Sequence, residues 1–251
     1  MEFNELLSDD LNFVLGRCPK DVRALLQEDY AVGHLYLAGG FIRATIAGER
    51  VNDIDLFGPT REKLREVAMQ FALARHGRLH ETDNAYTVLS PPRRPVQFIH
   101  RWTFGTPEAL CESFDFTIAQ AVVWWDGARW HSICSPRFYP DLAARRLYYT
   151  APEREEAAGG SFLRMRKFVG AGYSIQAFSL GKLVARLASK VGRSGLASEG
   201  EEGLARVFTG LLREVDPLTV VDGVDLVDEH QVVLANFGEI PEAAKAAGQA
   251  G

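Results

Sequence analysis

The chain has 251 residues, of which 47% are apolar and 24% are charged, and its formal net charge is −5. These values are ordinary for a globular protein of one large or two modest domains, and they exclude disorder, collagen and coiled coil as descriptions of the whole chain. No stretch approaches the roughly 18–20 apolar residues of a membrane span, and the acidic N-terminus is unlike a signal peptide. Cys18, Cys111 and Cys134 are too few and too scattered for a disulfide framework or a zinc site. We therefore expect three buried thiols in a reducing cytoplasm and no membrane contact.

The charge is unevenly distributed along the chain. Residues 161–198 contain seven basic residues and no acidic one, whereas residues 214–251 contain eight acidic residues and one lysine. The acidic total argues against a nucleic-acid binder. The basic stretch is typical either of a solvated helix face or of a surface that binds an anion.

Apolar spacing predicts a succession of helices and strands in the first 140 residues. In chain order these are mostly helix over 1–30, a strand over 34–38, a helical turn or two over 41–46, a strand over 51–57, a helix over 61–75, strands over 79–82, 85–89 and 96–100, a short helix from Thr106-Pro107, a segment over 114–119 that could form a strand, and a hairpin of 122–125 with 129–133. Asp83-Asn84 and Asp126-Gly127 are the expected hairpin turns.

The pattern changes to helix after Asp141. Amphipathic helices are predicted over 178–191 and 204–212, and the charged connector Glu153–Gly160 predicts a domain boundary. We therefore expect an α+β fold, with a head domain of residues 1–152 and an all-helical domain of residues 153–251.

Asp53 and Asp55 are the first candidates for chemistry. They lie two residues apart on a predicted strand, so their side chains should project to one face while Ile54 and Leu56 point into a core. Two adjacent carboxylates repel each other unless a cation lies between them, which is how a hard divalent ion is held together with substrate phosphates. Alone, an Asp-x-Asp pair is more often a solvent-facing pair at a strand end.

Gly39-Gly40, which precedes a predicted helix, strengthens this interpretation. A strand, a Gly-Gly turn and a helix start bring backbone N–H groups close to an anion, and Arg43 lies one turn into the helix. The combination of Gly-Gly, Arg43 and the aspartate pair is more specific for a phosphate site than any one of them.

The segment Ala38–Arg43, followed by Asp53-Ile54-Asp55-Leu56, resembles the head of the polymerase-beta nucleotidyltransferase superfamily. The branch that it resembles most contains CCA-adding enzymes and bacterial poly(A) polymerases. Phe114–Ile118 is similar to that family's Arg-Arg-Asp-Phe-Thr-Ile-Asn motif, which contacts the incoming nucleotide, and Phe162–Phe168 is similar to the start of its neck helices. The resemblance covers about residues 30–175 and implies a mixed or antiparallel sheet with flanking helices.

The sequence departs from the family pattern at several positions. Gln97 is the match for the family's third carboxylate, so either Asp115 supplies that acid or a second metal ion is held more weakly; we favour Asp115. Ser113 and Phe114 replace the two arginines of the nucleotide motif. Gly159-Gly160-Ser161 stands where CCA-adding enzymes have the Glu-Asp that reads the base.

The resemblance implies a metal-dependent enzyme that moves a nucleotide monophosphate from an NTP or dNTP to a hydroxyl and releases pyrophosphate without a template. Mg²⁺ or Mn²⁺ would be the cofactor. The expected catalytic and metal-binding residues are Asp53, Asp55 and Asp115, the nucleotide-binding residues are Gly39, Gly40, Arg43, Arg164 and Lys167, and the nucleic-acid-binding residues in the basic stretch are Arg166, Lys182, Arg186 and Lys190.

The acceptor is open at this point. An RNA 3′ end such as that of a tRNA is the family default. The alternatives are an oligonucleotide synthase in antiviral defence signalling, a toxin-type nucleotidyltransferase, and a catalytically weak nucleotide-binding regulatory module. Gln97 favours the last alternative, whereas Asp53 and Asp55 argue against it.

Overall fold

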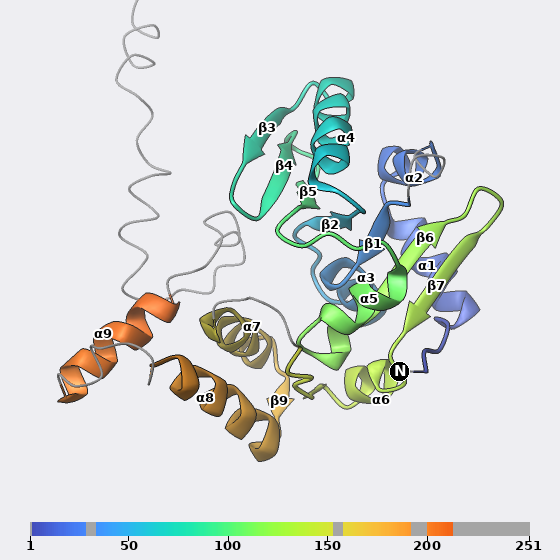
Figure 1. The fold of residues 1–251 in the computed structure, drawn as a ribbon. Helices are drawn as coiled ribbons and strands as arrows, with labels where there is room; N and C mark the ends of the chain where they lie inside the picture. The colour runs from blue at the N-terminus through green and yellow to red at the C-terminus, as the bar shows by residue number, and fades with distance from the viewer. Residues whose placement is uncertain (1, 29–33, 153–157, 192–199, 213–251) are drawn as a thin grey trace, which may run out of the picture.

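The computed structural model describes residues 2–28, 34–152, 158–191 and 200–212, and within them a seven-stranded sheet forms the centre of the molecule (Figure 1). The strands lie in the order β3-β4-β5-β2-β1-β6-β7. Their bounds are β1 (Tyr36–Ala38), β2 (Ile54–Phe57), β3 (Arg78–Glu81), β4 (Ala85–Leu89), β5 (Val96–Ile99), β6 (Ala121–Trp125) and β7 (Trp130–Cys134). β2 and β5 pair in parallel and the other neighbours pair antiparallel. The expected α+β class with a mixed sheet is confirmed.

The N-terminal helices cover one face of the sheet (Figure 1). They are α1 (Ser8–Arg17), α2 (Lys20–Glu28), α3 (Gly40–Ile46) and α4 (Arg61–Ala74). Because side chains alternate along a strand, Ile54 and Leu56 of β2 lie on this face with Val96 and Phe98 of β5, and all four are fully buried. This apolar burial, which stabilises the fold by about 25 cal/mol per Å², forces Asp55 and Gln97 to the opposite face.

A second, smaller core lies on that opposite face. The helix α5 (Pro107–Ser113) packs on β6 and β7 and buries Tyr36, Phe57 and Val122. It begins as the sequence predicts, because the Thr106 hydroxyl accepts a hydrogen bond from the Ala109 N–H and proline occupies the first turn. This core lies on the side of β1, β6 and β7, so Asp55 and Gln97 are on the other half of the face.

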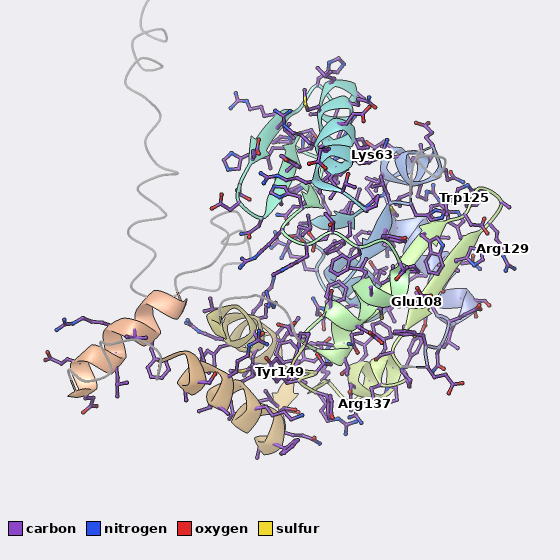
Figure 2. All side chains as sticks on the ribbon, in the orientation of Figure 1. Lys63, Glu108, Trp125, Arg129, Arg137 and Tyr149 are labelled. Atoms are coloured by element: carbon purple, nitrogen blue, oxygen red, sulfur yellow. The ribbon has the colours of Figure 1, made fainter. Side chains whose placement is uncertain are left out.

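The hairpin of β6 and β7 projects from the sheet, and Trp125 and Arg129 lie near its outer end (Figure 2). The Asp126 carboxylate accepts hydrogen bonds from the backbone N–H groups of Ala128 and Arg129, both at 2.8 Å, and Gly127 has φ 101°. The predicted Asp-Gly turn is therefore confirmed, with residues 126–129 between the strands.

The segment 114–119 is not a strand. It contains the short 3₁₀ helix η2 (Thr117–Ala119), and Phe116 forms only an isolated bridge with Tyr149. The reason is local hydrogen bonding, since the Ala119 N–H donates to the Phe116 carbonyl at 2.9 Å and the Gln120 N–H donates to the Thr117 carbonyl at 3.2 Å, which closes a 3₁₀ turn in place of a strand ladder. The beginning of the 51–57 strand was also placed too early, because β2 starts at Ile54 and Asp53 lies in the preceding loop.

The remaining elements follow η2 and the hairpin, and α7, α8 and α9 contact one another beside the sheet (Figure 1). They are α6 (Phe138–Ala143), β8 (Arg146–Leu147), α7 (Ala158–Gly170), β9 (Ser174–Ile175), α8 (Ala177–Val191) and α9 (Gly200–Leu212). The short strand β9, which pairs in parallel with β8, is an addition to the expected helices.

The predicted connector Glu153–Gly160 ends earlier than expected, because α7 begins at Ala158. Residues 153–157 lie outside the described residues, so the division into domains at residues 152 and 153 stays a prediction. Within the described part of the chain, no helix combines the length and the apolar character that a membrane crossing needs.

A buried carboxylate holds α6, β8 and η2 together. Asp141 has no exposed surface, and its oxygens accept hydrogen bonds from Arg137 Nε at 3.0 Å, Arg146 Nε at 2.8 Å and Thr117 Oγ1 at 2.7 Å. Arg137, labelled in Figure 2, lies one helical turn before it. A buried acid with two guanidinium partners and a hydroxyl partner is satisfied, but removing its charge leaves the partners without compensation.

We expect Asp141→Asn to lower the free energy of unfolding by about 3 kcal/mol, because the two arginines lose their shared anion. Urea denaturation followed by circular dichroism measures this. The matched control is Asp83→Asn on an exposed turn, which should change the free energy by less than about 0.5 kcal/mol. Equal midpoints for the two variants would contradict the structural role of Asp141.

Candidate functional site

Asp55 belongs to a row of polar side chains on the half of the sheet face away from α5. In the registered ladders Asp55 of β2 pairs with Gln97 of β5, and Gln97 pairs with Thr87 of β4. Residues in register on neighbouring strands point to the same face, so Gln97 lies directly beside Asp55. Gln97 is 5% exposed. An amide therefore occupies the position at which the family resemblance implies a third carboxylate.

A groove of about 890 Å³ opens next to this row, between α3, the segment leading into β2, and α7. Five of the residues singled out from the sequence line it: Gly40, Arg43, Asp53, Arg166 and Lys167. The first three are separated from the last two by more than one hundred positions in the chain. The fold therefore places the last turns of α7, with Lys167, against the loop that carries Asp53.

Asp53 and Lys167 face each other electrostatically across this groove. Burial raises the pKa of Asp53, against the opposing influence of Lys167 and Arg43. Burial also lowers the pKa of Lys167, while both Asp53 and Asp55 act to raise it. Loss of water thus disfavours the charged form of each group, and the opposite charge of the other group offsets part of this cost. The two predicted metal ligands, Asp53 and Asp55, thus both act on the same cationic side chain, that of Lys167.

Gly39 and Gly40 have different roles. Gly39 has φ 72°, and a Cβ atom there would lie 2.9 Å from a ring carbon of Phe114, so only glycine fits. A Cβ at Gly40 would meet nothing within 4 Å, and Gly40 lines the groove. Gly39 is thus required by the backbone and by packing, whereas Gly40 keeps the wall of the groove open to a ligand.

Arg43 is engaged within the protein. Its guanidinium forms an ion pair with Glu49 and lies over the ring of Phe168, with 4.9 Å between the guanidinium carbon and the ring centroid. Glu49 also accepts a hydrogen bond from the Tyr173 hydroxyl at 2.7 Å. Arg43 therefore joins α3 to α7 and to the segment before β9. Nothing in the sequence points to Glu49, whose contacts are with residues 6 and 124 positions away.

Asp115 is held by an arginine of α7. Its carboxylate is buried, and Arg164 Nε donates a hydrogen bond to Oδ2 at 2.6 Å. Across the described residues, no three His, Cys, Asp or Glu side chains are close enough together to hold a metal ion. The structure thus gathers Asp53 and Asp55 but does not bring Asp115 to them as a third ligand. The sequence signal for this pair is the absence of acids in residues 161–198, which means that the arginines of that stretch must find acidic partners elsewhere in the chain.

The four predicted nucleic-acid contacts are spread over two helices. Arg166 is exposed and lines the groove. On α8, Lys182 lies 4.8 Å from the ring centroid of Phe178, and Arg186 donates to the hydroxyl of Tyr149 at 2.7 Å. Tyr149 is labelled in Figure 2, near α7 and α8. The side chain of Lys190 lies outside the described residues, so a continuous row of cations along α8 stays a prediction.

The donor set at the groove fits a hard divalent cation. Mg²⁺ is commonly held by one or two carboxylates, with substrate phosphates and water completing its shell. Asp53 and Asp55 supply two carboxylates beside the same ammonium group, and their mutual repulsion is reduced by a cation. The residues present are therefore sufficient for one such ion together with a phosphate ligand.

The fold is shared with solved structures of CCA-adding enzymes. The Thermotoga maritima CCA-adding enzyme complexed with tRNA matches with a TM-score of 0.54 and 17% identity over 87% of this chain and 53% of that one. A CCA-adding enzyme with ATP matches with a TM-score of 0.54 and 18% identity over 88% and 53%. A complex with CTP matches with a TM-score of 0.53 and 17% identity over 88% and 53%. The chain thus spans about half the length of these proteins, and the nucleotidyltransferase resemblance is confirmed for the fold.

Comparison with curated protein sequences gives no match. A family model described as Gabija anti-defense 2 family protein (Gad2) matches residues 10–145. That range is more than half of the chain, and it contains Gly39, Asp53, Asp55 and Asp115 but not α7. The chain belongs to the Gabija anti-defense 2 family.

Proposed function

We propose that the protein is a metal-dependent nucleotidyltransferase that moves a nucleotide monophosphate from an NTP or dNTP to a hydroxyl acceptor. The observation that carries this proposal is the pair of half-buried carboxylates, Asp53 and Asp55, which both act on the charge of Lys167, with Asp53 and Lys167 lining an open groove. The fold shared with nucleotidyltransferases supports it. The family name adds a purpose, which is to counteract a defence called Gabija, and the free, buried cysteines suit a cytoplasmic setting.

In this proposal the acceptor oxygen forms a bond to the α-phosphorus while the bond from that phosphorus to the bridging oxygen breaks, and pyrophosphate leaves. Asp53 and Asp55 would hold Mg²⁺ or Mn²⁺, which supplies positive charge to the triphosphate and to the attacking oxygen. Lys167 would bind triphosphate oxygens once Asp53 and Asp55 hold the metal ion. The open wall at Gly40 would admit the phosphates, and Gly39 would fix the turn.

Arg43 and Arg164 act on the nucleotide from fixed positions in this proposal. Arg43 is anchored by Glu49, and Arg164 by Asp115. An anchored guanidinium loses less conformational freedom when it binds a phosphate or stacks on a base. Asp115 then has two candidate roles, as the third metal ligand or as the residue that positions Arg164. The ion pair with Arg164 favours the second.

The proposed acceptor is an RNA 3′ end, with Arg166, Lys182, Arg186 and Lys190 toward the RNA. One of the similar solved structures is complexed with tRNA, which supports this class of acceptor. A second candidate function is a nucleotide-binding regulatory module without transfer. The observation that favours it is Gln97 beside Asp55, where a third carboxylate would be needed.

The experiment that separates the two candidates is incubation with each labelled NTP and dNTP plus Mg²⁺, with and without RNA, resolved on a gel. Label transferred to RNA, or into new oligonucleotides, supports the enzyme. Mg²⁺-dependent NTP binding measured by calorimetry, with no transferred label on RNA or on protein, supports the regulatory module and contradicts the enzyme.

We expect Asp53→Asn and Asp55→Asn each to reduce transfer by about 10²-fold or more, because each removes a charge that acts on the reacting phosphate. Initial rates with labelled NTP measure this. Neither change should unfold the protein, since Asp53 lies in a loop that lines the groove and Asp55 is only half-buried. Asp83→Asn is the matched control and should keep full activity. Near wild-type rates in both site variants would sink the proposed mechanism.

The two roles of Asp115 predict different results for three variants. If Asp115 positions Arg164, then Asp115→Asn and Arg164→Gln should reduce transfer by similar factors of about 10–100 and raise KM for the NTP, with the Mg²⁺ requirement unchanged. If Asp115 is a metal ligand, only Asp115→Asn should raise the Mg²⁺ concentration for half-maximal rate. Gln97→Ala should have a mild effect in either case, and a larger loss for Gln97→Ala than for Asp115→Asn would refute both.

A further inference from the structure

A second pocket, of about 660 Å³, lies on the head away from α7. Its walls come from the start of α2 with Lys20 and Asp21, from the residue that ends α4, Arg75, and from the segment between β4 and β5 with Arg93 and Arg94. Four basic residues thus face one acid, in a chain whose formal net charge is −5. A local excess of three positive charges in an acidic protein needs an explanation.

The floor of this pocket is neutralised within the protein. The Arg75 side chain is only 2% exposed, and it donates to both oxygens of Asp21, from Nε at 2.9 Å and from Nη2 at 3.0 Å. Its third contact is the Arg94 carbonyl at 3.3 Å. Such a two-pronged pair occupies both oxygens of the carboxylate. The single acid of the pocket is therefore engaged mainly with Arg75, and its contact with the rim is the longer one to Arg93 at 4.0 Å.

The rim carries the uncompensated charge. Lys20, Arg93 and Arg94 are exposed, and among the described residues the one ion pair that they form is that of Arg93 with Asp21 at 4.0 Å. Like charges held close together on a rigid floor repel each other, and an anion seated among them relieves the repulsion. Guanidinium groups in particular match the paired oxygens of a phosphate.

The location of the pocket indicates what kind of anion it takes. Arg94 Nε donates a hydrogen bond to the carbonyl of Val51 at 3.1 Å, and Val51 lines the groove together with Asp53. The pocket and the groove therefore lie on either side of the segment 51–53, and Arg94 is anchored to that segment. A chain of phosphates that leaves the groove can continue past Val51 into the pocket, whereas a single nucleotide in the groove cannot occupy both.

We propose that this pocket binds the phosphodiester backbone of a nucleic-acid strand whose end lies in the groove. The inference extends the proposed acceptor to a second point of contact on the head, and it rests on the proposed function for the nature of the strand. Phosphate binding by the pocket is itself independent of transfer. Lys20, Arg93 and Arg94 would contact the backbone and carry no base specificity.

The test is the salt dependence of binding of a fluorescein-labelled single-stranded RNA to the full chain, followed by fluorescence anisotropy. The double variant Lys20→Gln/Arg93→Gln should weaken binding and flatten the log–log salt slope by about 1.4, since each lost phosphate contact removes about 0.7 for a single strand. ATP binding, measured separately by calorimetry, should stay unchanged because neither residue lines the groove.

The control is Arg65→Gln/Arg78→Gln, which removes the same charge from exposed positions outside both pockets. It should keep the wild-type slope. Equal slopes for the wild type and both double variants would overturn the proposal. Unchanged RNA binding with weakened binding of pyrophosphate or ATP in the Lys20/Arg93 variant would assign the pocket to free phosphate compounds and also overturn it. RNA binding that weakens in the Lys20/Arg93 variant, in a protein that transfers no nucleotide, would contradict the proposed enzyme activity and leave the binding role of the pocket intact.

Discussion

The site depends on the compensation of two carboxylates at the start of the central strand β2, Asp53 in the preceding loop and Asp55 on the strand. Taking a carboxylate out of water is costly, and a second carboxylate nearby adds repulsion, so a cation must be close. In this protein the cation is the ammonium group of Lys167, which loses water for the same reason. The raised pKa of Asp53 and the lowered pKa of Lys167 have the same cause, which is burial that the attraction between the two groups offsets only in part. The chemistry of the groove and the docking of α7 are thus linked.

The position of α7 follows from contacts between distant parts of the chain. The Arg43 guanidinium of α3, which is paired with Glu49, lies over the ring of Phe168 of α7, and Asp115 pairs with Arg164 of α7. On α8, Arg186 donates to Tyr149. These pairs hold Lys167 over the loop of Asp53. The basic stretch of the sequence is therefore used partly to join the helices to the head, and only its remainder is available to an external anion.

Much of the fold could be predicted because it is specified locally. The alternation of Ile54 and Leu56 with Asp55 identified both the strand and the face of the acid, and Thr106-Pro107 marked the start of α5. The Gly-Gly turn is also predictable from the sequence. The ring of Phe114, which is the reason that residue 39 must be glycine, is not. The apolar run of 114–119 is compatible with a strand, and no periodic pattern in it marks the 3₁₀ turn that forms there.

The partners of the site residues could not be predicted, because they depend on contacts between remote positions. Nothing near Arg43 in sequence shows that its guanidinium is covered by Phe168, and nothing near Asp115 shows that Arg164 reaches it. Gln97 is the exception. The resemblance matches it to the family's third carboxylate, and the parallel pairing of β2 and β5 sets it beside Asp55.

Under the proposed function, Lys167 balances the charges of Asp53 and Asp55 until a divalent ion and a nucleotide take its place. Mn²⁺ binding to the nucleotide-free wild type and to Lys167→Met, measured by electron paramagnetic resonance, tests this most directly. We predict tighter Mn²⁺ binding in Lys167→Met, because the competing ammonium group is gone. We also predict weaker NTP binding in this variant. Unchanged or weaker Mn²⁺ binding by Lys167→Met would contradict this role of Lys167.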